Sequence, residues 1–268
     1  TMMAYPLAAF VRFCQNHGLL QIKDRPQWRT VVGGSREYVK RMTAGVSGGV
    51  ILDRAITKVG RNPFGGAYIE DRYGKRDEFD HVVLACHGDQ ALALQETPNP
   101  RVEELLSAFK YERNLAILHN DQSLMPKNPK VWSSWNYLAE DHDGEQKVCV
   151  TYWMNRLQHL DENTPLFVTL NPPRQPKEGS VIRSFLYDHP LFDAGAMAAQ
   201  KDLWSIQGVD NIWYCGSYFG YGFHEDGIQS GLAVAEALGG VRRPWTVKDE
   251  SGRIHVTDRL SDKPSEAA

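Results

Sequence analysis

The chain has 268 residues, 42% of them hydrophobic, and a formal net charge of −3, which fits one or two globular domains with a real core. The slight acidity argues against a nucleic-acid surface, and no apolar run is long enough to span a membrane, since Arg12 interrupts the longest candidate. The four cysteines are widely spaced and form no C-x-x-C pair, so they indicate neither a zinc ribbon nor a disulfide framework, and we expect a cytoplasmic protein.

The first part of the chain predicts helices and strands in mixed order. Helices are predicted over residues 3–20, 36–42, 90–94 and 101–109. Strands are predicted over residues 50–59, 67–71 and 79–85. Gly18 is placed to end the first helix, and Ser35 is placed as the N-cap of the second. The apolar run 82–85 is typical of a parallel strand that is buried on both faces.

The middle of the chain is richer in strands. They are predicted over residues 115–119, 131–138, 148–154, 167–170 and 180–187. A short helix is predicted over residues 197–204, and the chain becomes polar after Trp245.

Residues 211–231 are the most informative segment. They predict a short buried strand, a glycine-rich aromatic loop and a helix that continues through residues 232–238. Such a unit directs backbone N–H groups and the positive end of a helix dipole at whatever occupies the loop, which suits phosphates or the pyrimidine edge of a flavin. The small residues Ser230 and Gly231 are expected to let this helix pack closely on the sheet. An ordinary strand-to-helix turn is the alternative.

This segment resembles the carboxy-terminal flavin-binding signature of the FAD-dependent amine oxidase, phytoene desaturase and protoporphyrinogen oxidase superfamily. Within that superfamily it is similar to a bacterial subgroup of predicted NAD/FAD-binding oxidoreductases. Further blocks in the same order support the resemblance, namely residues 28–35, 79–87, 132–137, 151–155 and 167–172. The resemblance implies an α/β fold, in which an incomplete FAD/NAD(P)-binding Rossmann-like domain is intertwined with an α+β substrate domain.

The resemblance also implies domain boundaries and cofactor contacts. The substrate domain would comprise residues 1–29 and 96–204, the FAD-binding domain residues 30–95 and 205–242, and residues 243–268 would be a polar tail. The implied cofactor-binding residues are Gly33, Gly34, Ser35, Val59, Ala85, Cys86, Gly216, Ser217, Glu225, Asp226, Gly227, Ile228 and Gln229. Val59 would contact the adenine through its backbone, and Ala85 and Cys86 would lie near the phosphates. Ser217 replaces the family's usual acid, whose role Glu225 or Asp226 would take.

The family's opening motif is absent. No G-x-G-x-x-G occurs in the sequence, and we expect the chain to be the carboxy-terminal part of a longer flavoenzyme. The alternatives are a short protein that has lost the motif, or a non-catalytic fragment or binding module that needs a separate N-terminal Rossmann half. A nicotinamide-dependent reductase without flavin would need the same missing motif.

The expected chemistry is hydride transfer between flavin and an apolar or amphipathic, lipid-like small molecule. The catalytic candidates are His224, Tyr221, Asn136 and Tyr152. Asn136 and Tyr152 belong to aromatic strands, of which only about half the side chains can face a cavity. The loop residues Tyr218, Phe219, Tyr221 and Phe223 would either form a wall over the flavin or pack the loop down. No metal site and no G-x-S-x-G nucleophile elbow is predicted.

Overall fold

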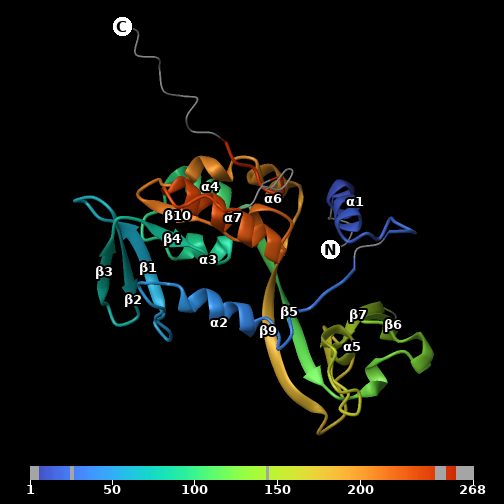
Figure 1. The fold of residues 1–268 in the computed structure, drawn as a ribbon. Coiled ribbons are helices and arrows are strands. Elements are labelled where there is room, and N and C mark those ends of the chain that lie inside the picture. The colour runs from blue at the N-terminus through green and yellow to red at the C-terminus, as the bar shows by residue number, and fades with distance from the viewer. Residues whose placement is uncertain (1–5, 25–26, 143–144, 245–251, 258–268) are drawn as a thin grey trace. The chain divides into compact units, whose positions relative to one another are not determined.

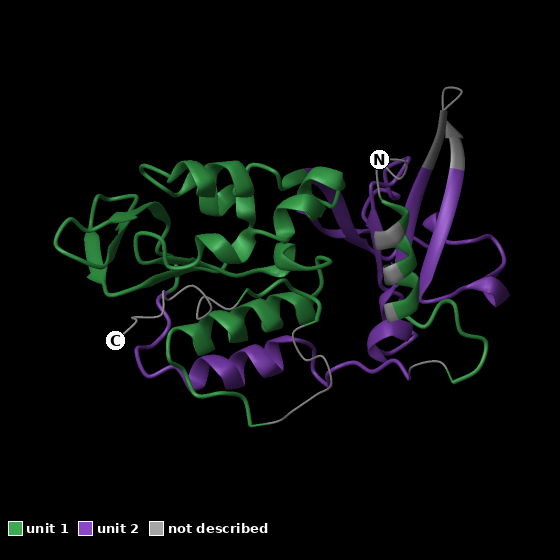
Figure 2. Ribbon diagram, turned by 90° about the horizontal axis from the view of Figure 1, so that it is seen from above, with its two compact units in different colours: residues 1–25, 52–111, 190–268 green, residues 26–51, 112–189 purple. Residues whose placement is uncertain are grey.

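The computed structural model describes residues 6–24, 27–142, 145–244 and 252–257. It divides into two compact units (Figure 2), of which unit 1 comprises residues 1–25, 52–111 and 190–268, and unit 2 residues 26–51 and 112–189. These units differ in part from the predicted domains, since residues 1–25 cluster with unit 1 and residues 26–51 with unit 2. The assignment of cofactor and substrate to separate domains stays a prediction.

The described helices and strands follow one another in mixed order along the chain (Figure 1). The helices are α1 (Leu7–Asn16), α2 (Arg36–Ala44), α3 (Gly88–Ala93), α4 (Pro100–Leu106), α5 (Met154–Gln158), α6 (Ala194–Gln200) and α7 (His224–Ala237). The strands are β1 (Ile56–Arg61), β2 (Ala67–Asp71), β3 (Arg76–Phe79), β4 (Val82–Leu84), β5 (Lys110–His119), β6 (Trp135–His142), β7 (Glu145–Trp153), β8 (Phe167–Leu170), β9 (Val181–Leu191) and β10 (Ile212–Tyr214). Single 3-10 turns cover Gln122–Leu124, Pro129–Val131, Leu203–Ile206 and Ser217–Phe219. None of these helices has both the length and the apolarity that crossing a membrane requires.

Two predicted helix ends have different outcomes. Residues 3–5 of the predicted first helix lie outside the described residues, and α1 is followed by Gly18 at φ 63°, as its left-handed end requires. Ser35 is the N-cap residue of α2, as predicted, but its side chain makes no capping hydrogen bond. No residue of α2 is buried.

Unit 1 contains two small sheets. Strands β1, β2 and β3 form an antiparallel meander, and β4 pairs with β10 in parallel. The single strand predicted over residues 79–85 is therefore two strands that belong to different sheets. The expectation of burial on both faces is wrong for β4, because the Val83 side chain is 42% exposed.

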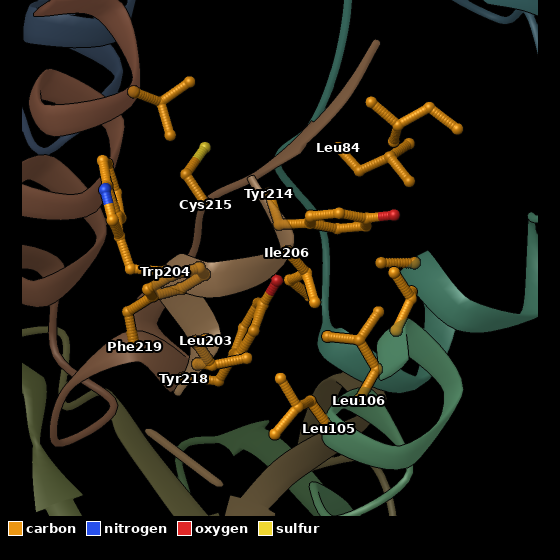
Figure 3. Packing of buried hydrophobic residues seen from close by; sticks show 14 of the residues in the cluster. Leu84, Leu105, Leu106, Leu203, Trp204, Ile206, Tyr214, Cys215, Tyr218 and Phe219 are labelled. Carbon is orange, nitrogen blue, oxygen red and sulfur yellow. The ribbon is translucent and has the colours of Figure 1, made fainter. Parts of the chain in front are cut away.

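The core of unit 1 surrounds the β4–β10 pair. Figure 3 shows side chains from α4, from the turn Leu203–Ile206 and from the loop after β10 pointing toward one another. Tyr214, Tyr218 and Phe219 are each 1% exposed, so much of the aromatic loop packs inward. Ile254, in the polar tail, is also buried in this core, whereas residues 258–268 of that tail lie outside the described residues.

Unit 2 is built on one five-stranded sheet with the strand order β6-β7-β8-β5-β9. Side chains alternate between its faces, so Thr151 and Thr169, which are register partners, share one face, and Tyr152 and Val168 share the other. The face that carries Thr151 and Thr169 has a row of buried polar side chains, and the opposite face is apolar.

Candidate functional site

The carboxyl ends of β4 and β10 lie side by side. Leu84 is the register partner of Tyr214, and the Cys215 N–H donates to the Leu84 carbonyl at 3.1 Å. The following residues also meet, since a Cβ on Gly216 would lie 3.2 Å from the Cys86 carbonyl oxygen and 2.8 Å from the Tyr218 ring. Only glycine fits between these groups. The structure thus brings together Cys86 and Gly216, which the sequence placed at the cofactor.

Two aromatic side chains complete this edge. The His87 ring stacks on Tyr111, with 4.4 Å between centroids and 12° between planes. The Gly88 N–H donates to the Tyr111 hydroxyl at 2.9 Å, and a Cβ on Gly88 would touch the Tyr218 ring at 3.6 Å. Burial raises the pKa of Tyr111 to about 12, so its hydroxyl stays protonated at neutral pH. Neither His87 nor Tyr111 was predicted as a site residue from the sequence.

Buried polar atoms without partners occur in the segments that follow β4 and β10. Among the described residues, the Tyr218 hydroxyl, His87 Nδ1 and Gln229 Oε1 are buried and have no hydrogen-bond partner. Burial raises the pKa of Tyr218 well above its ordinary value, which keeps its hydroxyl neutral and able to donate. An unpartnered buried polar group costs about 1–3 kcal/mol, so these groups fit a polar ligand that would satisfy them.

The start of α7 is tied to the loop by Ser230. The Ser230 hydroxyl accepts from the Gly216 N–H at 3.0 Å and lies within donating distance of the Gly227 carbonyl at 3.0 Å. The helix is thus held by hydrogen bonds rather than by the expected small-residue contact at Gly231, where a Cβ would meet nothing within 4 Å. Gly227 and Ile228 lie in the first two turns of this helix, and Ile228 is 53% exposed.

Asp226 is already fully engaged. Its buried carboxylate accepts from Arg253 Nε at 2.6 Å, from Arg253 Nη2 at 3.1 Å and from the Phe223 N–H at 2.8 Å. A Cβ on Gly220 would come within 2.4 Å of this carboxylate, so glycine is required there. Of the two acids considered for the missing family acid, Glu225 is the exposed one, and it bonds the Gln229 amide at 2.8 Å. Arg253 was not predicted as a site residue from the sequence.

The catalytic candidates are divided between the two units. In unit 1, His224 is exposed at the first position of α7, and the Tyr221 ring lies 5.4 Å from the Arg253 guanidinium. In unit 2, Asn136 and Tyr152 lie on opposite faces of the sheet, because Asn136 pairs with Thr151. The Asn136 amide is occupied by Ser133, accepting from its N–H at 2.9 Å and donating to its carbonyl at 2.6 Å.

Several predicted cofactor residues belong to other elements than the two strand ends. Gly33, Gly34 and Ser35 belong to unit 2, in the loop before α2. Val59 belongs to β1, and its N–H donates to the Leu94 carbonyl at 2.6 Å while its carbonyl accepts from the Glu96 N–H at 3.0 Å. The Val59 N–H could therefore donate to an adenine only if its bond to Leu94 opened, and the roles of these residues stay predictions.

The buried face of unit 2 carries a directed chain of hydrogen bonds. The Asp121 N–H donates to His119 Nδ1 at 3.1 Å, so a neutral imidazole carries its proton on Nε2, which lies 2.7 Å from the Thr169 hydroxyl. Thr151 donates to the Leu124 carbonyl at 3.1 Å. The Thr169 proton then points to the Thr151 oxygen, 2.8 Å away. Every donor and acceptor in this series of hydrogen bonds is satisfied only while His119 is neutral.

Unit 2 is expected to lose stability in mild acid through His119. Burial lowers the pKa of His119 below 6.5, so the folded chain keeps this imidazole neutral while the unfolded chain binds a proton near pH 6.5. The unfolded state therefore binds more protons, and the free energy of unfolding falls as pH drops through 6.5 toward the folded pKa. Urea denaturation at pH 8 and pH 5.5 measures this fall. The variant His119→Gln should show a smaller fall, and an equal fall in both would contradict the assignment.

Within the described ranges, no group of three His, Cys, Asp or Glu side chains lies close enough together to hold a metal ion.

Comparison with solved structures finds chains of similar fold. No family model and no curated protein matches the sequence. Among solved structures, a fatty acid isomerase from P. acnes has a TM-score of 0.54 at 12% identity over 76% of this chain. A redesigned putrescine oxidase has a TM-score of 0.53 at 14% identity over 77%, and cyclohexylamine oxidase from Brevibacterium oxydans 0.50 at 12% over 84%.

This chain spans about half the length of those structures, between 52% and 57%. At such identities the likeness shows the fold alone. The chain has a mixed helix-and-sheet fold like that of these solved structures, and the superfamily stays a prediction. The bacterial subgroup and the complete Rossmann-like arrangement stay predictions.

Proposed function

We propose that this chain belongs to an FAD-dependent oxidoreductase of the amine oxidase type, and that the ends of β4 and β10 with the start of α7 hold the cofactor. The observation that carries the proposal is the buried Tyr218 hydroxyl, which has no partner among the described residues at an edge where Gly216 admits no side chain. The sequence resemblance and the fold of the neighbouring structures support the same cofactor.

Each group at this edge has a role in that proposal. Tyr218 would donate its hydroxyl proton to a cofactor oxygen, since it stays neutral when buried. The first turns of α7 carry backbone N–H groups that favour negative charge on a bound ring. Gln229 Oε1 would accept a hydrogen bond from the ligand. Bound flavin would supply the hydride chemistry, and these residues would position it and stabilise its charge.

The first experiment is a visible absorption spectrum of the purified chain, repeated on the filtrate after denaturation. Flavin bands that move into the filtrate support the proposal. A colourless chain that stays colourless after FAD is added and filtered contradicts it for this chain.

Tyr218→Phe gives a sharper test. With flavin, we expect about tenfold weaker binding, because one buried hydrogen bond is lost. Without flavin, the variant should be at least as stable as the wild type, because an unsatisfied hydroxyl has been removed. Tyr214→Phe is the matched control: its hydroxyl bonds Gln95 at 3.1 Å, so this variant should lose stability instead. Titration with FAD and urea denaturation measure the two effects, and unchanged FAD affinity in Tyr218→Phe would remove this residue from the site.

A second candidate is a binding module that works only with a separate Rossmann half. The parallel pair β4–β10 has only two strands, and Val83 on it is 42% exposed. A further parallel strand beside this pair would complete the sheet. Gel filtration of the chain alone tests this idea, since an unpaired edge predicts self-association and a monodisperse monomer argues against it.

A further inference from the structure

An apolar hollow opens on one face of the unit 2 sheet, opposite the face that carries the buried polar side chains Thr151 and Thr169. Its volume is about 340 Å³, and strands β5, β8 and β9 with α5 enclose it. The side chains that shape it include Ala116, Leu118, Met154, Val168, Phe185 and Tyr187. This volume lies at the lower end of the range for small-molecule sites.

The hollow has no charged side chain in its lining. Gln158 and Tyr187 are the polar side chains that reach it, and the remaining side chains are apolar. A cationic ligand would therefore find no carboxylate inside. Asp188, the acid next to Tyr187 on β9, alternates to the other face and is paired with Arg113 at 3.1 Å.

Arg183 supplies a positive charge beside the Phe185 wall of the hollow. Residues 183, 185 and 187 share a face of β9, because side chains alternate along a strand. The Arg183 guanidinium lies 5.0 Å from the Phe185 ring centroid, and the Phe185 and Tyr187 rings stack at 5.6 Å. No carboxylate whose side chain is described pairs with Arg183. The exposed Arg183 side chain and the rings of Phe185 and Tyr187 therefore form a continuous row that leads into the apolar hollow.

We propose that this hollow binds an amphipathic carboxylate, with its alkyl or aryl chain between Phe185 and Leu118 and its carboxylate toward Arg183. That this ligand is the substrate rests on the proposed function, whereas its binding does not. Burial of the ligand's apolar chain would provide most of the affinity, because removing apolar surface from water is favourable. Arg183 would set the preference for a carboxylate over an amine.

Isothermal titration of the full chain, without FAD, tests this site with three ligands of one chain length. Dodecanoate, 1-dodecanol and dodecylamine are each used below their micellar concentrations. We expect dodecanoate to bind at least tenfold more tightly than dodecylamine, with 1-dodecanol between them. Arg183→Gln should lower dodecanoate affinity to that of the alcohol, and Arg183→Lys should keep the preference for the carboxylate.

Two further variants locate the chain-binding part. Phe185→Ser should weaken dodecanoate binding more than tenfold, because it removes an aromatic wall. Leu186→Ser is the matched control on the same strand, since this side chain is 64% exposed and faces the other way. Equal affinities for dodecanoate and dodecylamine, or equal effects of the two serine variants, would overturn the proposal. Because no FAD is present, dodecanoate binding supports this site even if the chain fails to bind FAD.

Discussion

Replacing Arg253 with methionine should lower the free energy of unfolding by about 3 kcal/mol, because it leaves the Asp226 carboxylate buried without its counter-charge. Asp226 is fully buried, and Arg253 contacts both of its oxygens, at 2.6 Å and 3.1 Å. The remaining Phe223 N–H bond cannot replace a guanidinium. Removing one partner of a buried ion pair is costly even where the pair itself adds little.

Urea denaturation of three variants tests this expectation. The double variant Asp226→Asn with Arg253→Met should be more stable than Arg253→Met alone, since no charge is then left buried. Arg101→Met is the matched control: Arg101 is exposed and pairs with Glu104 and Asp202, each at 2.8 Å, so its loss should cost less than about 1 kcal/mol. If Arg253→Met costs no more than Arg101→Met, the pair does not anchor α7.

The sequence predicted those elements whose pattern is local. Strands β2 and β8 have the predicted bounds, because their residues alternate or form a short apolar run between turns. The unit of β10, its loop and α7 also forms as predicted, although the helix begins earlier, at His224.

The strand predicted over residues 79–85 shows what a local pattern cannot decide. Phe79 pairs with Ala67 in an antiparallel sheet, whereas Val82 pairs with Ile212 in a parallel one. The break between β3 and β4 is therefore set by the strands with which they pair, and the apolar run itself gives no sign of it.

The candidate site likewise contains some residues that could be predicted from the sequence and others that could not. Cys86 and Gly216 were predicted from the family resemblance, and they meet because the two parallel strands before them end at a common edge. Tyr111 and Arg253 were missed because nothing in their neighbourhood in sequence indicates a site. Arg253 and Ile254 form a two-residue anchor within a polar tail, too short for any hydrophobic period to reveal.

Replacing Thr169 with valine should lower the free energy of unfolding by about 3 kcal/mol. Valine has nearly the same shape, so the loss arises from hydrogen bonds and not from packing. The His119 Nε2–H loses its acceptor in a site where His119, Thr151 and Thr169 are all 0% exposed. The Thr151 oxygen also loses the hydroxyl that donates to it. A buried donor left without an acceptor costs about 1–3 kcal/mol, and the second lost bond adds to this.

Thr169→Ser is the matched control, because it keeps the hydroxyl and removes one methyl group, at a cost of about 1 kcal/mol. Urea denaturation followed by tryptophan fluorescence compares the two variants, since Trp132 and Trp153 belong to the same unit. A valine variant no less stable than the serine variant would contradict the hydrogen-bond chain. The valine variant should also show a smaller loss of stability between pH 8 and pH 5.5, because a His119 without its acceptor gains less from staying neutral in the folded chain.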